Sequence, residues 1–111
     1  MKDPTARHAL ALDAMGNPTR REILRILREK EQPVGELAKR LPVSRPAVSK
    51  HLRLLERAGL VSRIARGNRH YCQLEPLGFE AARGWLDDFW DGALARFKIV
   101  AENTKPKRKR G

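Results

Sequence analysis

The 111-residue sequence has little of what stabilises small secreted domains or crosses membranes. It contains one cysteine, Cys72, and no apolar run close to the ~20 residues that span a bilayer. A single cysteine excludes an internal disulfide and is typical of a reducing compartment. The segment MKDPTARHALALDAMG lacks the long apolar stretch of a signal peptide. We therefore expect a cytoplasmic protein that does not insert into a membrane.

Acidic residues are also scarce, because 13 Asp and Glu stand against 24 Lys and Arg, for a net charge of +11. With 41% hydrophobic residues the chain can still fold, and its length suits one domain. The surplus is concentrated in residues 36–75, with nine basic and three acidic side chains, and in the basic segment 105–111. Residues 76–104 carry three basic and five acidic side chains. We expect a domain over 1–104, a disordered tail over 105–111, and a polyanionic partner: nucleic acid, an anionic membrane or an acidic protein.

Proline, glycine and capping residues divide most of the chain into helices. Asn17 and Ser44 are suited to cap helices, each with a proline in the first turn, and Gly16 and Gly59 end helices. The expected helices cover residues 5–15, the segment from Pro18 to the break at Gln32-Pro33, and residues 34–40, 44–57 and 76–102. The apolar stripes of the first two are Ala9, Leu10, Leu12 and Met15, and then Ile23, Leu24, Ile26 and Leu27.

Residues 61–74 alternate in character around the turn Arg66-Gly67-Asn68. This pattern predicts a two-stranded β-hairpin with a basic tip. Two short helices joined by a tight turn and followed by such a hairpin are typical of a winged helix-turn-helix, whose second helix enters the major groove of DNA. The predicted fold is therefore mainly α, with about five helices and a small two-stranded wing.

The helix over 44–57 meets the requirements of a groove-reading helix. At 100° per residue, Val48, Leu52 and Leu55 share one face, with His51 at its edge. The opposite side is polar and basic, which alone is also typical of a solvated helix face. The preceding short helix, the capped turn and the basic hairpin together favour DNA. The DNA-binding candidates on this helix are Ser44, Arg45, Pro46, Ala47, Ser49, Lys50 and Arg53.

The hairpin supplies a second set of candidates around Gly67. Arg66, Asn68 and Arg69 are expected to contact the phosphate backbone or the minor groove, and Arg63 lies on the strand before them.

The last helix has an apolar stripe too wide for one small domain to cover. Its Trp85, Phe89, Trp90 and Phe97 are expected to be shared between the core of the chain and a partner subunit.

Five segments make the sequence similar to one family. They are NPTRREIL at 17–24, LA at 37–38, VSRPAVSKHL at 43–52, LLERAGLV at 54–61 and RGNRHY at 66–71. Over about residues 8–101 the chain resembles the ArsR family of bacterial winged-helix repressors, specifically in the middle and loosely in the last helix. The resemblance implies a homodimer formed by the first and last helices, which adds Leu10 and Leu12 to the dimer candidates, and a repressor that binds double-stranded DNA.

The resemblance also implies two places where related proteins hold metals: a Cys-x-Cys pair in the first helix of the turn motif, and Asp, His and Glu side chains on the last helix. This sequence departs from both patterns. Pro33 and Gly35 stand at the positions of a Cys-x-Cys pair, and the last helix has carboxylates but no histidine. His70 and Cys72 would leave a site short of ligands, and Cys72 is better explained as a buried apolar residue. We expect no metal and no cofactor; an inducer, whether small molecule or protein, is left open.

Besides a repressor of a palindromic operator, three other functions are compatible with parts of the pattern. An enzyme is not expected, because no phosphate-binding glycine loop or nucleophile–base set is present. A sequence-neutral nucleic-acid-binding protein would use the same fold electrostatically. A protein-interaction module that has lost DNA binding is disfavoured by the basic wing.

Overall fold

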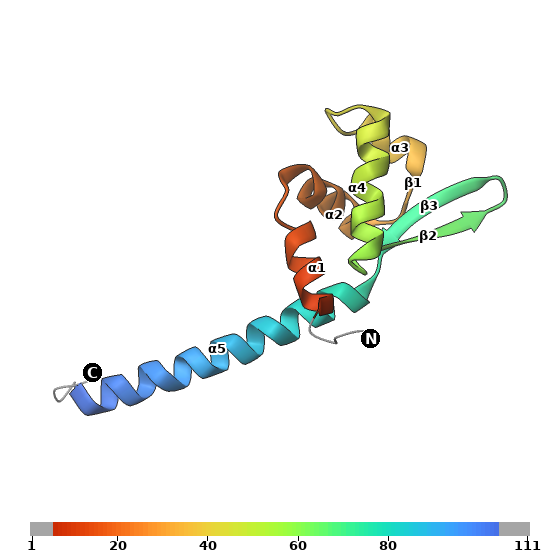
Figure 1. Cartoon of the computed structure of the whole chain (residues 1–111). Coiled ribbons are helices and arrows are strands. Elements are labelled where there is room, and N and C mark those ends of the chain that lie inside the picture. The colour runs from red at the N-terminus through yellow and green to blue at the C-terminus, as the bar shows by residue number, and fades with distance from the viewer. Residues whose placement is uncertain (1–5, 105–111) are drawn as a thin grey trace.

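The computed structural model describes residues 6–104, so the tail expected over 105–111 lies outside the described residues. In this part of the chain, five helices and three strands follow one another (Figure 1). Their bounds are α1 Ala6–Ala14, α2 Pro18–Glu29, β1 Gln32–Pro33, α3 Val34–Lys39, α4 Arg45–Arg57, β2 Val61–Arg66, β3 Arg69–Leu74 and α5 Pro76–Thr104. The predicted mainly helical winged fold is confirmed.

The two predicted helix caps are present. The Asn17 side-chain oxygen accepts a hydrogen bond from the Arg20 backbone N–H over 3.0 Å, at the start of α2. The Ser44 hydroxyl accepts one from the Ala47 N–H over 3.2 Å, at the start of α4. Each bond satisfies one of the N–H groups that a helix leaves without an internal partner, which is why these helices begin at these residues.

The core lies between α2, α3, α4 and the base of the sheet. Leu52 and Leu55 are fully buried and Val48 is 1% exposed, as the helical spacing of α4 predicts. The four predicted apolar residues of α2, Ile23, Leu24, Ile26 and Leu27, are also buried.

In α1 the buried face differs from the expected stripe. Ala11 is fully buried and Ala14 is 5% exposed, whereas Leu10 is 43% exposed and Ala9 is exposed. Small alanines let α1 approach its neighbours closely, so the residues with little apolar surface lie innermost. Two arginines of α2 hold the end of α1: Arg20 donates to the Ala14 carbonyl over 2.8 Å, and Arg21 to the Met15 carbonyl over 2.9 Å.

The sheet has three strands in the order β1-β3-β2, one more than the predicted two-stranded wing. Residues 32–33 form β1, antiparallel to β3, with Gln32 opposite Cys72 and Pro33 opposite Tyr71. Proline lacks an N–H and is confined to sheet edges, which is where β1 lies. The predicted hairpin is present, with Val61 opposite Leu74 and Arg66 opposite Arg69.

Helix α5 extends away from the rest of the molecule (Figure 1). Its Ala82 is buried, and Phe79 packs against the core. Four aromatics beyond them are exposed: Trp85 at 40%, Phe89 at 58%, Trp90 at 52% and Phe97 at 59%. The expectation that these four join the core of the chain is therefore wrong, because α5 leaves the body after its first turns. No helix within residues 6–104 is both long and apolar enough to cross a bilayer.

Candidate nucleic-acid interface

Helix α4 presents its predicted polar face to solvent. Arg45, Lys50 and Arg53 are exposed, as are Ser44 and Pro46, while Ala47 and Ser49 are half-buried. The opposite face is anchored in the core by Val48, Leu52 and Leu55. A helix held by one face and polar on the other fits the major groove, which is ~12 Å wide and admits a single helix.

The four candidate residues of the wing are exposed, but their side chains differ in the groups that they contact. Arg66 is ion-paired with Glu31, in the segment between α2 and β1. Arg63 is ion-paired with Glu56, on the last turn of α4. The guanidinium carbons of Arg66 and Arg69 lie 5.3 and 5.8 Å from the centroid of the Tyr71 ring, within cation–π range.

Sequence reasoning missed the two glutamates that hold the wing arginines. Glu31 lies 35 residues before Arg66, and no local pattern connects them. Glu56 is seven residues before Arg63. The sequence could have indicated this pair only through the expectation that the helix over 44–57 ends next to the first strand of the wing. Across residues 6–104, no carboxylate forms an ion pair with Arg45, Lys50, Arg53 or Arg69. These four cations carry the uncompensated charge of the interface.

One polar contact joins the core-facing side of α4 to α2. The Arg20 guanidinium lies 3.3 Å from Nδ1 of His51. Arginine is always a donor, so Nδ1 accepts and the imidazole is neutral in this arrangement. Burial, followed by the positive charges of Arg20 and Lys50, lowers the pKa of His51. The histidine therefore joins α4 to α2 in its neutral form, at the edge of the core face as the sequence predicts.

Cys72 is fully buried on β3, which confirms its interpretation as an apolar residue. Burial raises the pKa of its thiol to about 11. A neutral, buried thiol is neither a good nucleophile nor a good metal ligand. Within residues 6–104 no three His, Cys, Asp or Glu side chains are grouped so that they could hold a metal ion. Pro33 and Gly35 lie at the start of α3 and offer no side-chain ligand.

The dimer candidates lie on α1 and α5. His8 of α1 stacks on Trp85, whose ring also stacks on Phe89, with centroids 5.3 and 5.4 Å apart. Trp90 and Phe97 meet edge to face at 6.4 Å. Leu10 is exposed, and Leu12 is half-buried against the core.

A helix pair joined by a tight turn, an exposed basic second helix and a hairpin directly after it define a winged-helix DNA-binding protein. Comparison with known proteins identifies the family. The sequence profile of bacterial regulatory proteins of the arsR family matches residues 17–63. The chain is 47% identical over 93 residues to the HTH-type transcriptional regulator Rv2034 of Mycobacterium tuberculosis, covering 84% of this chain and 87% of that protein.

Two further relatives are also named as transcriptional regulators. The transcriptional repressor SdpR of Bacillus subtilis is 30% identical over 76 residues, or 68% of this chain and 84% of that protein. The solved structure of an ArsR-like transcriptional regulator from Rhodococcus sp. RHA1 is similar with a TM-score of 0.82 and 28% identity, over 92% of this chain and 96% of that one. The chain belongs to the ArsR family, and it is a DNA-binding transcriptional regulator.

Proposed function

We propose that the protein is a homodimeric repressor of a palindromic operator. The observation that supports this most directly is the exposed basic face of α4, where Arg45, Lys50 and Arg53 form no ion pair with a carboxylate of residues 6–104. In the proposed complex, Arg45, Ser49, Lys50 and Arg53 contact bases or nearby phosphates in the major groove. The hairpin lies over the adjoining minor groove, where Arg66, Asn68 and Arg69 contact the backbone. The named function of SdpR supports repression as the direction of control.

The homodimer is proposed from the apolar face of α5. Ten large hydrophobic side chains of the described residues are exposed, and nine of them lie on this helix. Exposed patches of this kind are usually covered by another protein surface. A second copy placed across a two-fold axis would cover both α5 helices and put two α4 helices in successive major grooves.

Binding-site selection from random DNA tests the proposal. We expect an inverted repeat with half-sites about one helical turn apart, bound ~10³-fold or more above random DNA. A sequence-neutral binding protein would instead enrich no repeat and would show a steep dependence on salt. Absence of any inverted repeat among the selected sequences would therefore decide for that alternative.

The selected site then tests the residue assignments. We expect Arg53→Ala to weaken binding by about 1–3 kcal/mol and to relax preference at one position of each half-site. Arg28→Ala, on the exposed side of α2, is the matched control and should leave affinity unchanged. Unaltered affinity in an Arg45→Ala, Arg53→Ala, Arg69→Ala variant would favour a protein-interaction module that does not use DNA.

We further propose that residues 1–104 act as one DNA-binding and dimerisation domain in the cytoplasm, without catalytic activity. The basic segment 105–111 would add phosphate contacts. Its deletion should weaken binding to all DNA alike and flatten the salt dependence. A change of sequence preference after deletion would contradict this role.

A further inference from the structure

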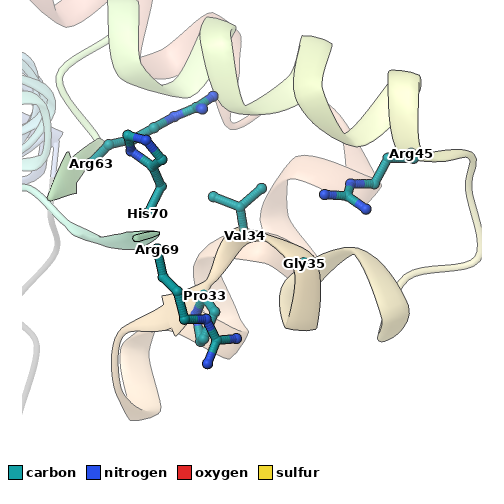
Figure 2. A pocket seen from close by; sticks show the side chains of 7 residues that line it. All are labelled: Pro33, Val34, Gly35, Arg45, Arg63, Arg69 and His70. Carbon is teal, nitrogen blue, oxygen red and sulfur yellow. The ribbon is translucent and has the colours of Figure 1, made fainter. Parts of the chain in front are cut away.

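A hollow of about 340 Å³ lies between the start of α3, the start of α4 and the wing. Segment 33–35 lines it together with four nitrogen-rich side chains, those of Arg45, Arg63, Arg69 and His70. Figure 2 shows Arg45 reaching in from α4 above Gly35, and Arg69 and His70 on the opposite side, from the wing. None of the lining residues is acidic.

The charges around the hollow are only partly compensated. Arg63 is ion-paired with Glu56, but within residues 6–104 no carboxylate pairs with Arg45 or Arg69. A concave surface with unpaired cations on two sides focuses positive potential and concentrates anions. Arginine is particularly suited to phosphate, because its planar fork donates two parallel hydrogen bonds to phosphate oxygens.

We propose that this hollow is a phosphate-binding site. The phosphate comes either from DNA or from a free phosphate group, and the inference rests on the proposed function only in the first case. If α4 occupies the major groove and the wing the adjoining minor groove, the strand between the two grooves crosses the space between Arg45 and Arg69, and one of its phosphodiesters enters the hollow. The other source is a free phosphate group. The volume lies at the lower end of the ~300–1,000 Å³ of small-molecule sites, so a phosphate monoester of a small molecule fits. The two sources compete for the same site, so a free phosphate group weakens DNA binding.

Gly35 allows the hollow to be altered without removing any proposed DNA-binding side chain. Outside its own helix backbone and chain neighbours, the nearest atom to a Cβ built at Gly35 is a guanidinium nitrogen of Arg45, 4.0 Å away. Gly35→Asp therefore places a carboxylate against Arg45 inside the hollow, and an aspartate suits the first turn of a helix. Gly35→Ala adds the Cβ alone and is the matched control. Pro42→Asp, in the exposed turn between α3 and α4, adds the same charge outside the hollow.

The first measurement uses the protein without DNA. Amide NMR shifts are followed while inorganic phosphate replaces chloride at constant ionic strength. We expect saturable shifts at the amides of Val34, residue 35 and His70, which persist in Gly35→Ala and Pro42→Asp and disappear in Gly35→Asp. His70→Ala, which leaves segment 33–35 intact, should weaken the shifts and serves as a second variant if Gly35→Asp does not fold.

The second measurement is the affinity for the selected DNA, in phosphate and in chloride at equal ionic strength. We expect phosphate to weaken binding, and Gly35→Asp to weaken it about tenfold more than Pro42→Asp, as expected for loss of one charge-assisted contact. If phosphate causes saturable amide shifts but Gly35→Asp binds DNA as well as Pro42→Asp does, the site takes a free phosphate group. If phosphate causes no amide shifts but Gly35→Asp binds DNA more weakly than Pro42→Asp does, the site takes a phosphate of the DNA backbone.

The inference is overturned if phosphate causes no saturable shifts and Gly35→Asp matches Pro42→Asp in DNA binding. Failure of the proposed function is distinguishable from this result. In that case no inverted repeat is selected, while the titration without DNA still reports on the hollow.

Discussion

The backbone N–H of Gly78 donates a hydrogen bond to the carbonyl oxygen of Gly59 over 2.7 Å. Gly59 ends α4 with a positive φ of 73°, and Gly78 lies in the first turn of α5. A Cβ built at Gly78 would lie 2.3 Å from the Ala58 carbonyl oxygen. The helix proposed to read DNA and the helix proposed to dimerise thus meet through backbone atoms, at a distance that only glycine permits.

Replacing Gly78 by alanine should therefore destabilise the protein. We expect the free energy of unfolding to fall by about 1–3 kcal/mol, because the new methyl group must push α5 away from the end of α4. Urea unfolding followed by circular dichroism measures this. Gly84→Ala is the control, since a Cβ there meets nothing within 4 Å, and it should leave stability unchanged or raise it by up to ~1 kcal/mol. Equal stability of the two variants would mean that the Gly59–Gly78 contact relaxes at no cost.

Trp90→Lys should dissociate the proposed dimer. Trp90 is 52% exposed within one chain, and a charge on this apolar face would be buried without a partner in a dimer. We expect the dimer dissociation constant to rise about 30-fold or more, the effect of losing an aromatic residue worth about 2 kcal/mol. Sedimentation equilibrium gives the constant. Gly84→Lys adds the same charge on the other side of α5 and should leave the dimer intact; a Trp90→Lys protein that remained fully dimeric would remove Trp90 from the interface.

Acid should weaken the protein through His51. Above its ordinary pKa of about 6.5 the ring is neutral in both the folded and the unfolded chain. As the pH falls below that value, the unfolded chain takes up a proton that the folded chain does not, because burial and Arg20 lower the pKa of the folded state. The free energy of unfolding should therefore decrease from about pH 6.5 down to that lowered pKa.

Urea unfolding at about pH 7.5 and pH 5.5 measures the decrease attributed to His51. His51→Gln keeps an oxygen that can accept from Arg20 but does not titrate, so it should lose less stability between the two pH values. An identical loss in both proteins would assign the pH dependence to other groups.

Cys72 should resist alkylation in the folded protein. With a thiol pKa of about 11 and no exposed surface, it carries far less thiolate at pH 8 than a free cysteine. We expect iodoacetamide to react about a hundredfold or more slowly than in the urea-unfolded chain, as mass spectrometry can follow. Rapid labelling of the native protein would show that β3 opens readily.

Local signals predicted the helices well, and long-range contacts escaped prediction. Asn17 and Ser44 cap their helices through atoms three residues away, so the sequence shows both partners of each bond. Strand β1 has two residues and no periodicity, and its existence depends on β3, some 40 positions later. The Glu31–Arg66 ion pair joins residues 35 positions apart and was equally hidden from local patterns.

The helices α1 and α5 are present, but the expected buried residues of each were wrong, for different reasons. Hydrophobicity ranks leucine above alanine, yet close helix packing places Ala11 and Ala14 innermost and leaves Leu10 outside. In α5 the periodic pattern identified an apolar stripe, but it did not show that Trp90 and its neighbours lie outside the core of the chain, and their place in a dimer interface stays a prediction.

The division of charge along the chain has a consequence for the encounter with DNA. Segment 36–75, which holds α4 and the wing, is strongly basic, while α5 carries more acidic than basic residues. Residues 6–104 are therefore electrically asymmetric, and the field of a DNA duplex attracts α4 and the wing toward the phosphates more strongly than it attracts α5, while the basic segment 105–111 supplies a separate attraction. Such orientation before contact raises the fraction of collisions that are productive, so the charge pattern favours rapid association with DNA in the correct orientation.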